Sequence, residues 1–142
     1  MIEKVTAVSK GMYTEGQAGS HTIRIDEPES MGGGDQGANP LATLLVALVG
    51  CENAVANFVA KEIEFDLQGI DFEVEGSIDP RGMMGDPSVR TQFKRVTVHA
   101  KVTTSETEER VQELQKIVDA RCPISTTLVA ADVTLVANWT KA

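Results

Sequence analysis

The sequence is poor in aromatic residues, in cysteines and in positive charge. Aromatic residues make up 4% of the 142 residues, and 13 Lys and Arg stand against 21 Asp and Glu, which gives a net charge of -8. Phosphate backbones and anionic membrane surfaces are bound by basic faces, which this composition does not supply. Neither nucleic acid nor a membrane is therefore an expected partner.

Long apolar runs and a disulfide framework are also absent. The longest uninterrupted apolar run, Leu44 to Val49, is too short to span a bilayer, and the first residues show no pattern of a signal peptide. Two cysteines in 142 residues are too few to hold a fold together as disulfides. We expect a single domain over residues 1–142 that buries a core of its own and works in the reducing cytoplasm.

The stretch from Asn39 to Cys51 predicts the helix around which the chain is organised. Asn39 suits the N-cap, and Pro40 suits the first helical position, where an amide would be unpaired anyway. Residues 41–51 carry no charge and are apolar on nearly all sides. Such a helix is expected to be buried on nearly all sides over roughly twenty residues, with Cys51 deep in the interior.

Alternating and amphipathic patterns predict the remaining elements. A capping box of Ser105 and Glu108 predicts the start of a second helix, which Pro123 ends before a further short helical turn. Strands are predicted at residues 2–8, 20–26, 69–76, 96–102 and 133–139. The order β-β-α-β-β-α-β, with a long central helix, is typical of an α+β fold.

The two cysteines are the first candidates for chemistry. Cys51 and Cys122 are too far apart for a redox or zinc spacing motif, and a free cysteine on an apolar face is most often a small core residue. Cys122, however, precedes Pro123, which can open a helix, and follows Arg121, and both features favour a thiolate. From these residues alone Cys122 is the more acidic thiol, and Cys51 needs a cation from elsewhere in the fold.

Other sites are weaker candidates. Residues 32–37 contain a G-x-G-x-x-G pattern, but no strand runs directly into it, which argues against a dinucleotide loop. His21 and His99 lack ligand spacing to either cysteine, so no metal and no other cofactor is expected. A nucleophile pair of Cys51 and His21 for acyl transfer stays open.

Two motifs in this order resemble the OsmC/Ohr family, the osmotically inducible and organic hydroperoxide resistance proteins. The chain is more similar to the less characterised OsmC-like branch at the end of its second predicted strand. The residues that carry the resemblance are Asn39-Pro40 with the apolar helix to Cys51, Cys122-Pro123-Ile124-Ser125, and Gly19-Ser20-His21. The resemblance implies an intertwined homodimer, with long central helices between sheets and sites at the subunit interface.

The resemblance also implies a thiol peroxidase of the oxidative stress response. In that chemistry Cys51 attacks an organic hydroperoxide, Cys122 resolves the sulfenic acid, and a dithiol reductant restores both thiols. The family's hydroperoxide reductases orient a thiolate-stabilising arginine by a glutamate directly after Asn-Pro, a position that Leu41 holds here. Activity is therefore expected to be weak, with Arg24 as a weak candidate for the arginine. Glu52 points about 100° away from its neighbour Cys51 on the helix and is expected to make an interface hydrogen bond.

Two further functions stay open. The chain could be a non-enzymatic, stress-related protein that binds a small apolar ligand at the dimer interface, with incidental thiols. Alternatively, it could be a purely structural dimer module.

Overall fold

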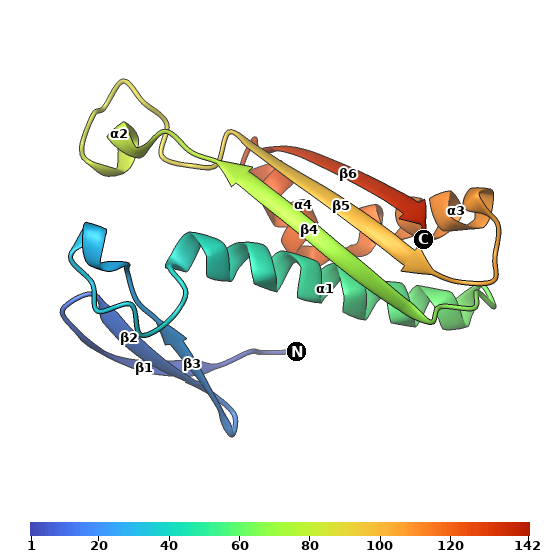
Figure 1. Cartoon of the computed structure of the whole chain (residues 1–142), viewed down its shortest axis with the longest axis horizontal. Coiled ribbons are helices and arrows are strands. Elements are labelled where there is room, and N and C mark those ends of the chain that lie inside the picture. The colour runs from blue at the N-terminus through green and yellow to red at the C-terminus, as the bar shows by residue number, and fades with distance from the viewer. The chain divides into compact units, whose positions relative to one another are not determined.

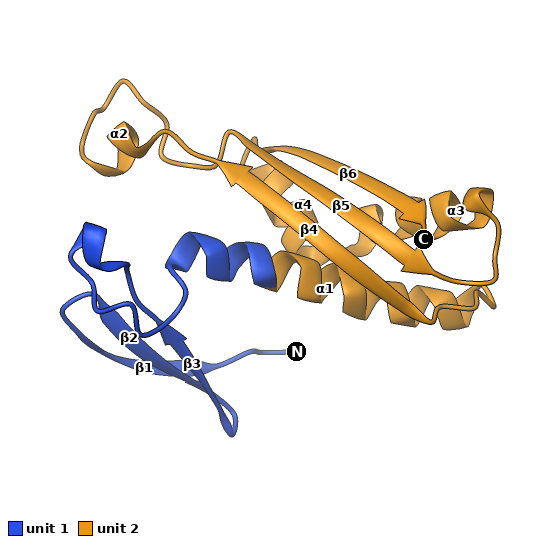
Figure 2. Cartoon of the chain, in the orientation of Figure 1, with its two compact units in different colours: residues 1–46 blue, residues 47–142 orange.

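A computed structural model describes residues 1–142 and divides into two compact units, residues 1–46 and residues 47–142 (Figure 2). A single domain over the whole chain stays a prediction. Figure 1 shows the elements, which are β1 (Val5–Lys10), β2 (Tyr13–Ala18), β3 (His21–Ile25), the 3-10 turn η1 (Glu29–Met31), α1 (Pro40–Glu62), β4 (Gly69–Ser77), α2 (Pro80–Met83), β5 (Arg95–Thr103), α3 (Glu108–Arg121), α4 (Pro123–Ala130) and β6 (Thr134–Lys141). The α+β class is confirmed, whereas the predicted order of elements omitted β2 and the short helix α2.

The first unit contains an antiparallel sheet in the order β1-β2-β3. The prediction of two strands before the long helix was wrong, because β2 is a polar segment without an alternating apolar pattern and pairs through its backbone. Its register aligns Ala7, Gly16 and Ile23 on one face, and Val8, Glu15 and Arg24 on the other. Arg24 therefore lies on the face opposite Ile23, as the alternation predicted.

The glycine-rich segment after β3 is held by a buried carboxylate. Asp26 is 2% exposed, and its side chain accepts hydrogen bonds from the backbone amides of Glu27 at 2.8 Å, Gly34 at 3.2 Å and Gln36 at 3.1 Å. A Cβ at Gly37 would collide with the backbone carbonyl of Arg24, so only glycine permits this close approach. Hydrogen bonds thus hold this glycine-rich segment in place.

Helix α1 begins as predicted. The side chain of Asn39 accepts a hydrogen bond from the amide of Ala42 at 2.8 Å, and the helix runs for 23 residues. A single chain does not bury the helix on nearly all sides, because Val46 is 65% and Phe58 is 62% exposed, so the burial expected against a sheet, another helix or a partner subunit stays a prediction. Only one stripe is buried, consisting of Leu48, Glu52, Ala56, Val59 and Ala60.

By length and composition alone, α1 is long and apolar enough to cross a membrane. The argument from the short run Leu44 to Val49 was therefore incomplete, because the whole helix rather than one uninterrupted run has to be compared with the bilayer. One such helix is weak evidence, since the core helix of a soluble protein meets the same criterion.

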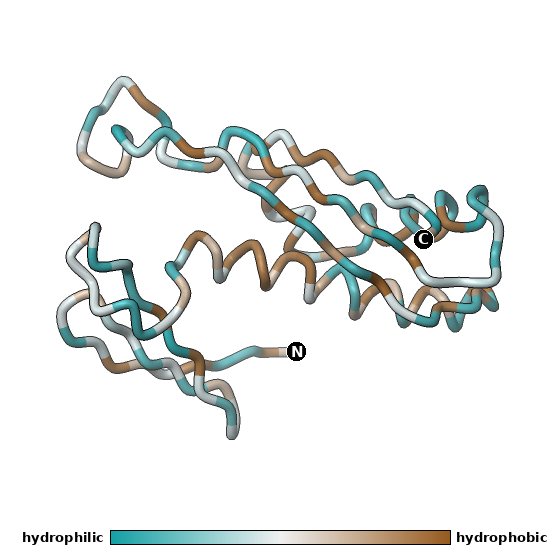
Figure 3. Tube along the Cα trace, viewed as in Figure 1, coloured by the Kyte–Doolittle hydropathy of each residue, from teal (hydrophilic) through white to brown (hydrophobic).

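The second unit contains the sheet β4-β5-β6, in which β4 and β5 are antiparallel and β5 and β6 are parallel. The parallel pair is joined by a crossover through α3 and α4 (Figure 1). Apolar and polar positions alternate along β4 and β5 (Figure 3), and Val96, Val98, Ala100 and Val102 are all buried on β5. The three strands predicted after the long helix are confirmed.

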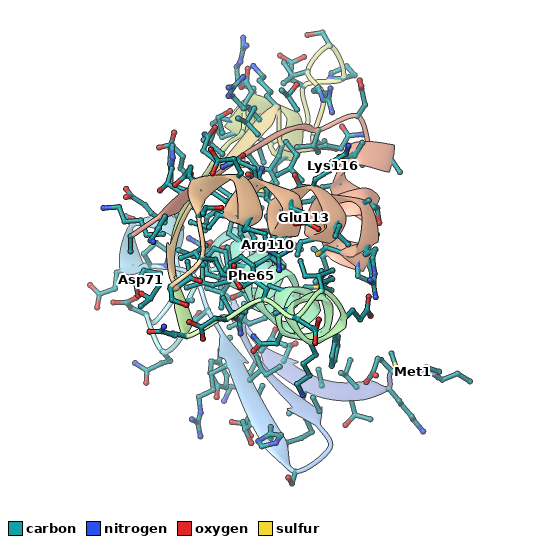
Figure 4. All side chains as sticks on the ribbon, turned by 90° about the vertical axis from the view of Figure 1, so that its right-hand side faces the viewer. Met1, Phe65, Asp71, Arg110, Glu113 and Lys116 are labelled. Carbon is teal, nitrogen blue, oxygen red and sulfur yellow. The ribbon has the colours of Figure 1, made fainter.

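The core of the second unit lies between this sheet and the helices. Its buried cluster combines residues of α1 with Val111, Leu114 and Val118 of α3 and with Trp139 of β6. The amphipathic stripe predicted for the second helix is therefore confirmed. At the end of the unit shown in Figure 4, the guanidinium of Arg110 lies 5.7 Å from the ring centre of Phe65.

The predicted capping box at the start of α3 was wrong. Thr107 is the N-cap, and its side chain accepts a hydrogen bond from the amide of Arg110 at 3.3 Å. The hydroxyl of Ser105 is engaged instead with the carboxylate of Asp66 at 2.6 Å. Ser105 is thus used to fix the loop before the helix.

Candidate functional site

The two cysteines both lie against the N-terminus of α4 in the second unit. Cys122 is the N-cap, and its Sγ accepts a hydrogen bond from the amide of Ser125 at 3.5 Å. The backbone amide of Ile124 faces Cys51 and lowers the pKa of its thiol. Because Pro123 has no amide hydrogen, Ile124 and Ser125 provide the first two amide donors of this helix. The end of α4 that attracts negative charge therefore faces both sulfurs.

Both cysteines are free thiols in the structure. Cys122 is fully buried, whereas Cys51 is only partly buried, so the expectation that Cys51 lies deep in the interior was wrong. The cause is that Cys51 lies beside the buried stripe of α1 and not on it. The two thiols are 71 positions apart in sequence, and Cys122 lies close enough to raise the pKa of Cys51, but the two sulfurs are not at disulfide distance in this structure.

The environment of Cys51 opposes ionisation overall. Burial is the largest influence and raises the pKa of the Cys51 thiol, while the hydrogen bond from the Ile124 amide lowers it. The side chain of Cys122, by its hydrogen bond and its charge, and the charge of Glu52 raise the pKa further. At neutral pH Cys51 is therefore mainly a thiol in the single chain.

Glu52 is the unexpected member of the site. The side chain is 0% exposed, and its Oε1 accepts a hydrogen bond from the hydroxyl of Ser125 at 3.2 Å, while Oε2 is buried without a partner. Burial raises the pKa of Glu52 to about 7, the Ser125 hydrogen bond lowers it, and the charge of Asp119 raises it. Within the chain Glu52 bonds Ser125, and the interface hydrogen bond predicted for it stays a prediction.

The arginine next to Cys122 is not directed at either thiol. The guanidinium of Arg121 pairs with both carboxylate oxygens of Glu62 at 2.6 and 2.9 Å, which joins the C-terminal ends of α3 and α1. Its charge is therefore neutralised at the surface. In this unit the amides of α4, rather than a side-chain cation, provide the positive potential at the sulfurs.

The remaining candidates lie away from the two cysteines along the chain, and most of them belong to the first unit. His21 is exposed at the start of β3, and Arg24 is 3.8 Å from the carboxylate of Glu15 on the neighbouring strand. Leu41 lies in the first turn of α1. His99, in the second unit, is exposed on β5, and no group of three His, Cys, Asp or Glu side chains could hold a metal ion.

Sequence reasoning found the two cysteines but missed the Glu52–Ser125 contact. A signal was present in the helical spacing, because Glu52 stands four residues after Leu48 and four before Ala56. Both of these neighbours are fully buried, so the carboxylate between them lies on the same buried face. An acidic residue on the apolar stripe of a helix is the pattern to look for.

A family model and several solved structures match this chain. The family model described as OsmC-like protein matches residues 32–137, and no curated protein matches the chain. Solved structures include an OsmC-like protein from Mycoplasma pneumoniae, which is 23% identical with a TM-score of 0.86 over 100% of this chain and 98% of that chain.

Two further solved structures have names that refer to hydroperoxides. An organic hydroperoxide resistance protein OsmC from Legionella pneumophila is 17% identical with a TM-score of 0.76 over 99% of this chain and 97% of that one. The organic hydroperoxide resistance protein OhrB of Bacillus subtilis is 21% identical with a TM-score of 0.69 over 99% of this chain and 98% of that one. These solved structures support the fold, and the match to the family model over residues 32–137 shows the family. The chain therefore belongs to the OsmC-like protein family.

Proposed function

We propose that the chain is a thiol-dependent peroxidase that reduces organic hydroperoxides, with Cys51 as the attacking thiol and Cys122 as the resolving thiol. The observation that carries the proposal is that both cysteines lie at the N-terminus of α4, where the Ser125 amide donates to Cys122 and the Ile124 amide lowers the pKa of Cys51. A helix N-terminus favours negative charge, and a thiolate is the form that attacks an O–O bond. The names of the Legionella and Bacillus proteins support the substrate class.

The partial exposure of Cys51 and the burial of Cys122 support this division of roles. An attacking sulfur needs access to substrate, whereas a resolving sulfur only needs access to the oxidised partner. Positions one turn before and after Cys51 on α1 are Ala47 and Val55, which are apolar and suit an organic tail better than hydrogen peroxide. We therefore expect a preference for cumene or tert-butyl hydroperoxide.

The proposed reaction consists of one oxidation by the hydroperoxide, one condensation that forms the disulfide, and one reduction. The Cys51 thiolate forms a bond to the distal peroxide oxygen, the O–O bond breaks, and an alcohol leaves after protonation. Cys122 then displaces water from the sulfenic acid and forms a disulfide. A dithiol reductant, in a reducing compartment such as the cytoplasm, restores both thiols.

The activity is expected to be weak for two reasons. Leu41 stands where the family's hydroperoxide reductases orient an arginine with a glutamate, and burial raises the pKa of Cys51. Loss of one preorganised electrostatic contact typically costs about 2.7 to 4 kcal/mol, or a hundredfold or more in rate.

The test is turnover of cumene hydroperoxide with a dithiol reductant by three proteins. Wild type should consume the peroxide slowly, Cys51→Ser should have no activity, and Cys122→Ser should react once and accumulate a sulfenic acid that a dimedone-type probe traps. A wild-type rate equal to that of Cys51→Ser would refute the peroxidase and favour a protein that binds a small apolar ligand.

A further inference from the structure

The structure buries one acidic side chain beside the two thiols without a cation. Glu52 lies on the buried stripe of α1, between the fully buried side chains of Leu48 and Ala56. An ionised carboxylate in such a position has a high desolvation cost unless it is paired with a cation. The residue is therefore a poor choice for packing alone, because a neutral side chain would fill the same position at a lower cost.

Hydrogen bonds connect Glu52 to the resolving thiol. Ser125 donates its hydroxyl proton to Oε1 of Glu52 at 3.2 Å, and the amide of the same residue donates to the Sγ of Cys122 at 3.5 Å. On the other side, Glu52 follows Cys51 directly on α1 and is close enough for its charge to affect that thiol. Glu52 and Cys122 thus share Ser125 as a hydrogen-bonding neighbour, and Glu52 adjoins Cys51 on α1.

The groups around Glu52 favour a neutral carboxyl near neutral pH. Oε2 is buried without a hydrogen-bond partner, and the charged group that acts on the side chain from another element is Asp119 of α3, which is itself an acid. The inward positions of β5 are apolar, and the Arg121 guanidinium at the end of α3 is occupied by Glu62. Burial raises the pKa of Glu52 to about 7, so the carboxyl can both give and take a proton under physiological conditions.

On the basis of the function proposed above, we propose that Glu52 is the proton carrier of the cysteine pair. The carboxyl protonates the alkoxide released at Cys51, and the resulting carboxylate then accepts the proton of Cys122. Glu52, next to the attacking cysteine, would thereby replace part of the electrostatic stabilisation that the family's reductases obtain from an arginine, which Leu41 cannot orient.

The protons balance over one cycle. In the first step the Cys51 thiolate takes OH from the hydroperoxide, and the proton of Glu52 converts the departing alkoxide into an alcohol. In the second step the Cys122 proton passes to the Glu52 carboxylate, the S–S bond forms as the S–O bond breaks, and the same proton leaves with hydroxide as water. In the third step a dithiol is oxidised, Cys51 returns as a thiolate and Cys122 as a thiol, and the proton released recharges Glu52.

A neutral Glu52 also fits the electrostatics of the attack. Because the charge of Glu52 raises the pKa of Cys51, the thiolate is favoured when the carboxyl carries its proton. The site then holds one negative charge, on the sulfur, with the proton nearby that the alkoxide needs. After the attack the charge moves to the carboxylate, when Cys51 is already a neutral sulfenic acid.

The test compares Glu52→Gln with wild type in single-turnover oxidation by cumene hydroperoxide across neutral pH. The thiolate fraction of Cys51, measured by its rate of alkylation with iodoacetamide, is used to normalise each rate. Glutamine keeps the size and the acceptor for Ser125 but cannot transfer the proton, so the rate per thiolate should fall about a hundredfold and lose its dependence on pH near 7. The matched control is Glu62→Gln, on the same helix at the surface, which should keep the wild-type rate per thiolate.

A second variant keeps the proposal testable if Glu52→Gln does not fold. Ser125→Ala retains the carboxyl but removes the hydrogen bond that lowers its pKa, so the pH dependence of the rate per thiolate should move to higher pH than in wild type. A wild-type protein that consumes hydroperoxide, with both variants equal to it per thiolate, would refute the role of Glu52 alone. A wild type no faster than Cys51→Ser would instead refute the peroxidase. In that case a protonated carboxyl band in the infrared difference spectrum between wild type and Glu52→Gln would still test the buried proton, and its absence at pH 6 would count against the proposal.

Discussion

The two units of the chain bury their apolar side chains very differently. Residues 47–142 enclose a continuous core that includes Val98, Leu114 and Trp139, each 0 or 1% exposed. Residues 1–46 form a regular three-stranded sheet but bury no apolar side chain, and their only buried residue is Asp26. Secondary structure alone therefore does not make a core, and the first unit needs a surface that a single copy of it does not contain.

The register of the first sheet indicates which face needs that surface. Val5, Ala7, Ala18, Ile23 and Ile25 point to one side. The other side, apart from Val8 and Tyr13, carries polar residues, among them the Glu15–Arg24 pair. One apolar face and one polar face are typical of a sheet that packs on one side. The exposed apolar residues of α1 point to the same need. We expect the missing surface to come from a second copy of the chain, in the homodimer that the family resemblance implies.

The largest expected effect is the loss of this dimer on Ile23→Asp. Burial of an isoleucine contributes roughly 1.5 to 3 kcal/mol, and a twofold interface contains the substitution twice. A charge on the apolar face should therefore weaken association at least about a hundredfold, which sedimentation equilibrium measures.

The control for the apolar face is Thr6→Asp, which places the same charge on the opposite face of the same sheet. This variant should remain a dimer. A wild-type protein that is a folded monomer at micromolar concentration would contradict the homodimer. The exposed apolar face of the first sheet would then have no partner.

The sequence predicted best the elements that are determined by residues close together in the chain. Asn39 and Pro40 start α1, and the alternation of β5 matches its buried and exposed positions residue by residue, because caps and periodicity are properties of neighbouring residues. The prediction failed where a contact with a residue distant in sequence determines the local structure. Ser105 caps no helix because Asp66 takes its hydroxyl, and β2 exists through pairing with strands on both sides.

The candidate site shows the same division. The sequence pointed to Cys51 and Cys122 and to the helix that starts at Pro123, which is a local feature. It could not show that Ile124 donates to Cys51 or that Ser125 binds Glu52, since these contacts join segments about seventy residues apart. The buried carboxyl next to Cys51 became evident only when the helices packed.

The next effect concerns the second unit, where oxidation should join Cys51 to Cys122. Treatment with diamide should produce a peptide pair linked by this disulfide in mass spectrometry. A cross-link that closes a loop of about seventy residues stabilises by up to roughly 4 kcal/mol in the chain-entropy model. The oxidised protein should therefore unfold at a higher denaturant concentration than the reduced protein.

Cys122→Ser is the control for this cross-link, because it retains the attacking thiol but should show no gain in stability with diamide. Two thiols that stay free in wild type after diamide treatment would indicate small core residues without redox chemistry. That result would remove the basis for the peroxidase while leaving the fold of the second unit intact.

A smaller effect is the dependence of stability on pH caused by Glu52. Its pKa is about 7 in the folded chain and near 4.5 in an unfolded one, so the folded state binds the extra proton between these values. The contribution of Glu52 is complete below pH 4.5 and is lost as the pH rises through 7, by roughly 3 kcal/mol. The difference in unfolding free energy between wild type and Glu52→Gln should fall by this amount from pH 4.5 to 7.5.

Glu62, on the same helix, should make stability depend on pH with the opposite sign. Its hydrogen bonds to Arg121 lower its pKa, so its contribution is present above the unfolded value and is lost as the pH falls. The difference between wild type and Glu62→Gln should therefore rise with pH, and only slightly, since the pair is exposed. Equal slopes for the two variants would contradict the burial of Glu52.

The smallest effect tests whether the two units unfold together, and it uses the cap at the start of α1. The side chain of Asn39 accepts from the amide of Ala42, and loss of such a cap costs about 1 kcal/mol. The first turns of α1 belong to the first unit and the rest of the helix to the second. For one cooperative domain, Asn39→Ala should lower hydrogen-exchange protection equally in β5 and in residues 42–46. The matched control is Asn57→Ala, an exposed position within the helix, where alanine should slightly raise stability through its higher helix propensity. Protection lost only in residues 42–46 would mean that the units unfold separately, and that the core of the second unit does not depend on the first.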